Sequence, residues 1–140
     1  MGPTPKDRVL AFLAEFHDSP DFDKLGSFFA PEATYQPLVP TTAVFHGRDA
    51  LIGALRKQYL TYYDCKCEIH ACLGDDHHVF TERTDHVTLH KNDLRVASRV
   101  CAIFDCDPDG RIVAWREYWD TAHIARQMGT DVDHVVSAAG

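Results

Sequence analysis

The spacing of apolar residues divides the chain into a helical first part and a strand-rich second part. Up to residue 63, apolar residues recur mostly every three or four positions, which predicts helices, with one short strand over 33–38. From residue 64 onward the pattern is that of strands separated by turns rich in Gly, Asp and Asn. Helices are predicted to begin at Pro5, at Phe22, near Gly47 and after Asp120, and four strands are predicted over about 64–73, 77–90, 94–105 and 111–119.

This order of elements predicts an α+β fold. Helices followed by a run of antiparallel strands are typical of a strongly curved, mixed or antiparallel sheet with helices packed on it. We therefore expect one cone-shaped domain over residues 1–140 that encloses an apolar pocket, since this length suits a single domain. The segment 129–140 is small and polar, and we expect it to be a flexible tail.

The charge balance narrows the classes of partner. Lys and Arg number 14 and Asp and Glu number 21, which gives a net charge of −7. An acidic chain repels phosphate groups, so we expect neither nucleic acid nor a membrane as a partner, but a small apolar substrate or ligand. No apolar run is long enough to span a membrane, and the first residues lack the pattern of a signal peptide, so we expect a cytoplasmic protein.

The cysteines and histidines do not predict a metal site or a disulfide framework. The number of cysteines, five, is odd, and Cys65 and Cys67 lack the two-residue spacer of zinc motifs. We interpret these cysteines as small, buried strand residues and the histidines as scattered, partly exposed side chains. The sequence also lacks a glycine-rich phosphate loop and a haem motif, so we expect no metal and no cofactor.

Charged residues interrupt the apolar rows of two predicted strands. Successive strand residues point to opposite faces, and Arg83 and Asp85 share a row with Val87 and Leu89. We expect this row to face the interior. Lone buried charges are costly, so an inward arginine and an inward carboxylate are expected to pair.

The last strand shows the same pattern. Glu117 shares its row with Trp115 and Trp119, and Tyr35 on the first strand can add a hydroxyl group. Arginine has five donors and can bridge two carboxylates, so a group of Arg83, Asp85 and Glu117 is predicted. Such a group is either a structural ion pair in the core or the floor of a pocket.

A pair of carboxylates bridged by arginine can perform acid–base chemistry. Two neighbouring carboxylates do not both ionise easily and titrate as a unit, so one can act as a base while the other supplies a proton. This push–pull arrangement can add water to a strained ether such as an epoxide without a covalent intermediate.

Four segments resemble the limonene epoxide hydrolase family: Phe80–Val87, Asp109–Ile112, Trp115–Asp120 and Phe45–Leu51. The similarity extends over about residues 6–127. This family belongs to the nuclear-transport-factor-like superfamily, together with SnoaL-like polyketide cyclases and ketosteroid isomerases. The resemblance implies a curved sheet with helices around a deep apolar pocket, no cofactor, and a homodimer formed through the sheet.

The resemblance also implies roles for individual residues. Arg83 corresponds to the bridging arginine, and Asp85 to the acid that protonates the epoxide oxygen. Glu117 stands where the family has its basic Asp, and Tyr35 corresponds to a tyrosine that holds the attacking water. Pro37 stands where the family has an Asn that also holds this water.

The substrate pocket is expected to include two large and two aliphatic side chains, which are Trp115, Trp119, Val87 and Leu89. The tryptophans can stack on a ligand or simply fill the core. Gln36 and His46 are candidates for the water contact that Pro37 does not provide. The alternatives to a hydrolase are a SnoaL-like cyclase or isomerase of a polyketide- or steroid-like molecule, and a non-catalytic binder of an apolar small molecule.

Overall fold

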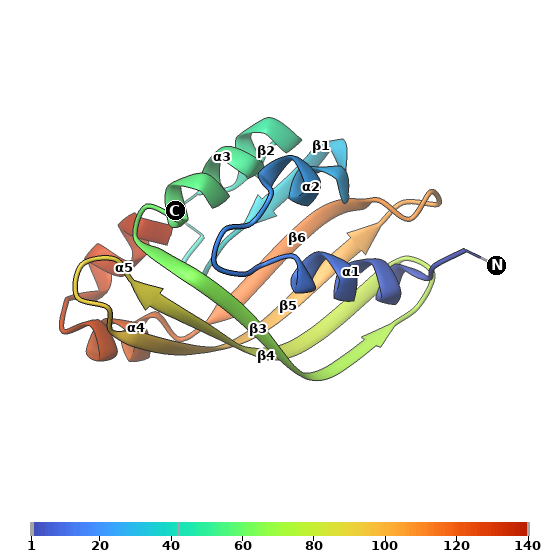
Figure 1. Ribbon diagram of the computed structural model, residues 1–140. Helices are drawn as coiled ribbons and strands as arrows, with labels where there is room; N and C mark the ends of the chain where they lie inside the picture. The colour runs from blue at the N-terminus through green and yellow to red at the C-terminus, as the bar shows by residue number, and fades with distance from the viewer. Residues whose placement is uncertain (1, 42, 140) are drawn as a thin grey trace.

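The computed structural model describes residues 2–41 and 43–139 and confirms the predicted α+β class (Figure 1). The helices are α1 (Pro5–Ala14), α2 (Phe22–Ser27), α3 (Arg48–Gln58), α4 (Thr121–Met128) and α5 (Val132–Ala139). The strands are β1 (Phe29–Gln36), β2 (Phe45–His46), β3 (Tyr62–Gly74), β4 (His78–Leu89), β5 (Arg95–Cys106) and β6 (Ile112–Trp119). The four long strands lie within a few residues of their predicted bounds.

The strands form one mixed sheet in the order β2-β1-β6-β5-β4-β3. The pair β1–β6 is parallel and all other neighbours are antiparallel. Figure 1 shows the sheet curving beneath α1, α2 and α3, while α4 and α5 lie at one end of it. The first strand begins earlier than predicted, at Phe29. Pro31 fits there because it lies where the β1–β6 register is interrupted, between Phe29 and Thr34.

The first helix begins where the sequence predicts. The side chain of Thr4 accepts a hydrogen bond from the backbone N–H of Asp7, and the Asp7 carboxylate accepts one from the backbone of Thr4. This capping box fixes the direction in which α1 approaches the sheet. Phe12 on α1 then contacts Phe29 and Trp115 edge-on, with ring centroids 5.1 Å apart in both cases. These rings form the core beneath one half of the sheet.

The C-terminal segment contains helix α5, where the sequence analysis expects a tail. Gly129 ends α4 in the left-handed conformation, and Asp131 accepts a hydrogen bond from the backbone N–H of His134 at the start of α5. Val135 is buried in a second cluster with Leu89, Val96, Ile124 and Ala125. The apolar residues of this segment are small, so their helical spacing is a weak signal in the sequence, and only the tertiary contact makes it evident.

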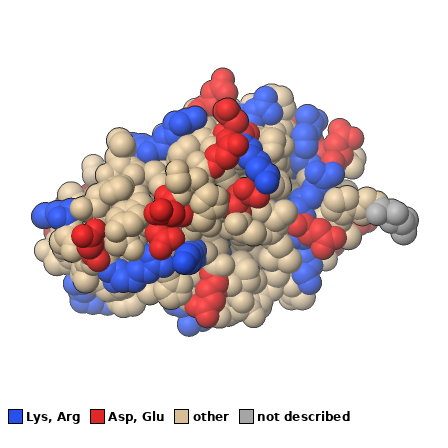
Figure 2. All heavy atoms as spheres, viewed as in Figure 1, with Lys and Arg blue, Asp and Glu red and all other residues tan. Residues whose placement is uncertain are grey.

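The surface carries charges of both signs. On the face shown in Figure 2, basic and acidic side chains are interspersed rather than gathered into areas of one sign. In the part of the chain that the structure describes, every helix is too short or too polar to cross a membrane.

Candidate active site

A cavity of about 140 Å³ lies between the sheet and helices α3, α4 and α5. Its lining is mainly apolar, and Asp85 and Glu117 are the carboxylates that border it. The residues around it come from distant parts of the chain: Tyr35, Pro37, Gln58, Thr61, Tyr62, Cys65, Asp85, Val87, Leu89, Val96, Ser98, Val100, Glu117, Trp119, Ile124, Met128, Val135, Ala138 and Ala139. A small apolar molecule with one or two polar atoms suits such a space.

The three charged residues singled out in the sequence meet at this cavity. Arg83 donates from Nε to Asp85 Oδ1 at 2.7 Å and from Nη2 to Asp85 Oδ2 at 3.0 Å. The same Nη2 also donates to Glu117 Oε2. Arg83 is 1% exposed and Glu117 is 7% exposed, whereas Asp85 is more accessible. One buried guanidinium therefore holds two carboxylates at the cavity.

Strand register explains how this contact forms. Arg83 on β4 lies opposite Val100 on β5, and Glu117 on β6 lies opposite Ala102 on the same strand. The arginine side chain thus reaches across β5 to the strand beyond it. Ala102 is small, which leaves room for this crossing. Asp85 lies two residues further along β4, so it projects from the same face as Arg83.

Glu117 is held through one oxygen. Trp115 donates from Nε1 to Glu117 Oε2 at 3.0 Å, and this oxygen also accepts from Arg83. Burial raises the pKa of Glu117; the positive charge of Arg83 opposes this rise, and the nearby Asp85 adds to it. The pKa of Arg83 is also raised, because the charges of Glu117 and Asp85 outweigh its burial. Among the described residues both of these hydrogen bonds go to Oε2, so Oε1 is able to accept a proton.

Tyr35 belongs to a series of hydrogen bonds that also includes Gln58 and Tyr62, and of these three residues only Tyr35 was predicted for the site. Gln58 at the end of α3 donates from Nε2 to Tyr35 Oη at 3.1 Å, and Tyr62 donates from Oη to Gln58 Oε1 at 3.1 Å. Gln58 Nε2 also donates to the carbonyl of Ala139 on α5 at 3.3 Å. Burial and the nearby Glu117 raise the pKa of Tyr35, so its phenol keeps its proton. This proton is free to be donated because Tyr35 accepts from Gln58.

The expected pocket residues fall into two groups. Val87, Leu89 and Trp119 line the cavity, as does Pro37, whose carbonyl accepts a hydrogen bond from Trp119 Nε1 at 2.8 Å. Trp115 lies outside this lining. It is stacked on Tyr35 with ring centroids 4.2 Å apart and is 2% exposed, so it packs in the core and anchors Glu117.

The candidates for replacing the expected asparagine also lie elsewhere. Gln36 and His46 are outside the residues that line the cavity, and His46 is exposed. Gln58 reaches the cavity instead, from the helix rather than from the first strand. A glutamine in the last turn of a helix usually faces solvent, so Gln58 was not predicted. The available signal was weak: Gln58 follows Ala54 by four positions and shares its helix face, and Ala54 is buried.

Residues 9–115 match the family described as the SnoaL-like domain. The chain belongs to the SnoaL-like family. The resemblance to limonene epoxide hydrolases is confirmed by a curated relative, the epoxide hydrolase EphG of Mycobacterium tuberculosis. This relative is 34% identical over 112 residues, which cover 80% of this chain and 70% of the relative.

Solved structures agree with this family assignment. A limonene-epoxide-hydrolase-like epoxide hydrolase of M. tuberculosis superposes on this SnoaL-like chain with a TM-score of 0.74 at 29% identity, covering 95% of this chain and 96% of the other. The epoxide hydrolase/cyclase-like enzyme SalBIII, whose structure is described with pyran ring formation in the polyether salinomycin, gives a TM-score of 0.74 at 21% identity. That match covers 85% of this chain and 92% of SalBIII, and it shows the fold alone.

Proposed function

We propose that this SnoaL-like chain hydrolyses a small apolar epoxide in one step, without a cofactor. The observation that carries the proposal is the single guanidinium of Arg83, which holds Asp85 and Glu117 together at an apolar cavity. Two carboxylates in contact with one arginine can share a proton, so one is available as a base while the other is an acid. The named relatives that act on epoxides support the same reaction class.

Glu117 is the base in this proposal. Its Oε2 is fixed by Arg83 and Trp115, so Oε1 can accept a proton from a water molecule. Tyr35 donates a hydrogen bond to the oxygen of this water and positions it, and Gln58 fixes the direction of the Tyr35 hydroxyl. Gln58 therefore compensates for Pro37, which has no polar side chain.

Asp85 is the acid. The water oxygen forms a bond to one epoxide carbon, its proton passes to Glu117, and the C–O bond of the ring breaks. The released oxygen takes the proton of Asp85, which gives a vicinal diol. Glu117 then carries the proton taken from the water, and Asp85 lacks one. Transfer of one proton from Glu117 to Asp85 through water restores the starting state.

Turnover of an epoxide panel in oxygen-18 water tests this proposal. The wild-type chain should give diol with one labelled oxygen, and Asp85→Asn and Glu117→Gln should each lower kcat by at least about 100-fold, as expected for loss of a general acid or base. Glu82→Gln is a matched control, because Glu82 is an exposed β4 residue that contacts Arg99. Diol formation that persists in both site variants would contradict the proposed roles.

Ring closure is the second candidate reaction. If a substrate hydroxyl takes the place of water, the same acid and base can form a cyclic ether, and the match to SalBIII favours including this reaction. Hydroxy-epoxides in the panel distinguish the two, because cyclisation incorporates no oxygen-18. A chain that binds these compounds but converts none of them is a binding protein.

A further inference from the structure

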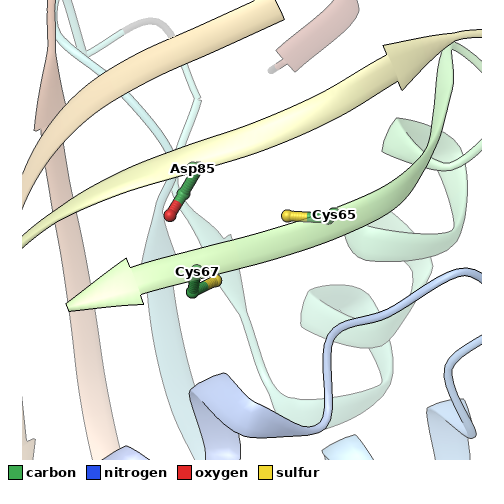
Figure 3. Close-up of side chains that lie close together, drawn as sticks. All are labelled: Cys65, Cys67 and Asp85. Carbon is green, nitrogen blue, oxygen red and sulfur yellow. The ribbon is translucent and has the colours of Figure 1, made fainter. Parts of the chain in front are cut away.

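Two thiols and one carboxylate converge beside the Arg83 contact. Cys65 and Cys67 lie two positions apart on β3, and Asp85 lies directly opposite Cys67 on β4, so the side chains share one face of the sheet. Figure 3 shows the three side chains gathered where these strands run side by side. One sulfur from each cysteine and one carboxylate oxygen all lie within 4.8 Å of one another. This spacing is close to that of ligands around a single ion.

The chemistry of these atoms selects a thiophilic cation. Thiolates bind soft and borderline ions such as zinc and cadmium, whereas magnesium and calcium prefer sets of oxygen ligands. Two sulfurs and one carboxylate oxygen provide three positions of a tetrahedron. Cys65 and Asp85 both line the cavity, so the cluster borders the space where a substrate would lie.

The charges of the site are compatible with such an ion. A divalent ion forms two bonds to sulfur and releases two protons, and the proton of Asp85 passes to Glu117, so the total charge of the site does not change. The carboxylate of Asp85 remains bonded to Arg83, and each of its oxygens has a second lone pair for the ion.

We propose that Cys65, Cys67 and Asp85 form a binding site for a thiophilic divalent cation, and that its occupation inhibits the enzyme. The inhibitory part rests on the proposed function, because the ion would occupy the carboxylate that protonates the epoxide. It would also fill part of the cavity next to Cys65. Inhibition should be reversible by a chelator, since the bonds to sulfur form and break with exchange of protons.

Cadmium titration of the reduced, metal-free chain tests the site. The ultraviolet cadmium–thiolate charge-transfer band should saturate at one ion per chain. Zinc in excess should compete with cadmium for the site and weaken this band. Cys67→Ser should weaken cadmium binding by more than about tenfold, at least the effect of losing an outer-shell partner in other metal sites. Because Cys65 is buried, both Cys65→Ser and Cys65→Ala are measured, so that a folding defect in one variant is not mistaken for the loss of a ligand.

Two further variants test whether the band comes from this cluster. Cys101→Ser should leave the band unchanged, because Cys101 is an exposed residue of β5 outside this cluster. Asp85→Asn should keep the two sulfur contacts and the band but bind cadmium less tightly. A band that survives loss of Cys65 and Cys67, or that disappears in Cys101→Ser, would overturn the site.

The band does not depend on turnover, so it separates this proposal from the proposed function. If the chain converts no epoxide but forms the band as described, the metal site stands and the hydrolase proposal fails. If the chain converts epoxides at the same rate with one cadmium ion bound, inhibition is refuted. Loss of turnover with one equivalent of cadmium and its recovery with a chelator would support both.

Discussion

At the scale of single residues, the site depends on one buried cation that two carboxylates share. Without Arg83, Asp85 and Glu117 would face each other with no compensating charge. Removing one partner of a buried ion pair is far more costly than removing an exposed charge. Arg83 therefore stabilises the folded state and holds both carboxylates at the cavity.

Arg83→Met should lower the free energy of unfolding at neutral pH by about 3–5 kcal/mol. In the variant Glu117 loses the positive charge that opposes the rise of its pKa, so this pKa rises further and the folded state binds more protons at Glu117 than the unfolded state does. The stability of the variant should therefore increase as the pH is lowered through the raised pKa of Glu117. Urea unfolding at several pH values measures this. Arg99→Met, on an exposed residue, is the control, and equal losses in the two variants would contradict the prediction.

Gln58→Leu should lower kcat about fivefold, with little change in KM. The hydrogen bond that orients Tyr35 contributes about 1 kcal/mol, and its loss affects the water rather than the binding of the epoxide. Steady-state kinetics give the two constants separately. Gln127→Leu is a control at a glutamine that bonds to Ala97 on β5, away from Tyr35. A rise in KM at unchanged kcat would assign Gln58 to substrate binding instead.

The residue pattern predicts part of this site and not the rest. Charges in an apolar row are rare, so alternation alone placed Arg83, Asp85 and Glu117 inside, and the structure brings them together. Alternation does not distinguish a pocket wall from the core, which is why Trp115 was expected in the wall. Gln58 is polar and ends a helix, so only its spacing of four positions from Ala54 distinguishes it from a surface residue.

At the scale of elements, turns and caps were predictable, but the role of the last helix was not. The four long strands are separated by turns rich in Gly, Asp and Asn. The helix after Asp120 is capped by that residue, whose side chain accepts a hydrogen bond from His123 N–H at 3.0 Å. Helix α5 gains its stability from packing against the cavity wall, which no local signal reveals. Its Ala138 and Ala139 close the cavity, and Lys57 on α3 donates to the carbonyl of Ser137.

A chain that ends at Asp131 should still fold but lose about 2 kcal/mol of unfolding free energy, which corresponds to the burial of Val135. It should also bind an apolar substrate less tightly, because the cavity loses one wall. Urea unfolding and the KM for an epoxide measure the two effects. Asp133→Ala, at an exposed position of α5, should change neither. Unchanged stability and KM in the shortened chain would show that α5 does not close the site.

At the scale of the whole molecule, the cavity joins segments that are far apart in the chain. Pro37 follows the first long strand, Gln58 ends α3, Asp85 and Glu117 come from strands on either side of β5, and Val135 comes from the last helix. The order of helices and strands predicted a curved sheet around a pocket, because only a curved sheet lets one layer of helices enclose a space. Which segments meet there depends on the parallel β1–β6 contact and on α5, and both are tertiary features.

Because these segments meet at the cavity, a ligand bound there should stabilise the whole fold. An unstrained cyclic ether has the acceptor oxygen of an epoxide but does not open. At 100 times its Kd it should add about 2.7 kcal/mol, which raises Tm by roughly 5–10 °C. Val87→Phe fills the cavity and should abolish this shift, whereas Val113→Phe, outside the lining, should retain it. Thermal unfolding with and without the ether measures the shift, and equal shifts in both variants would place the ligand outside the cavity.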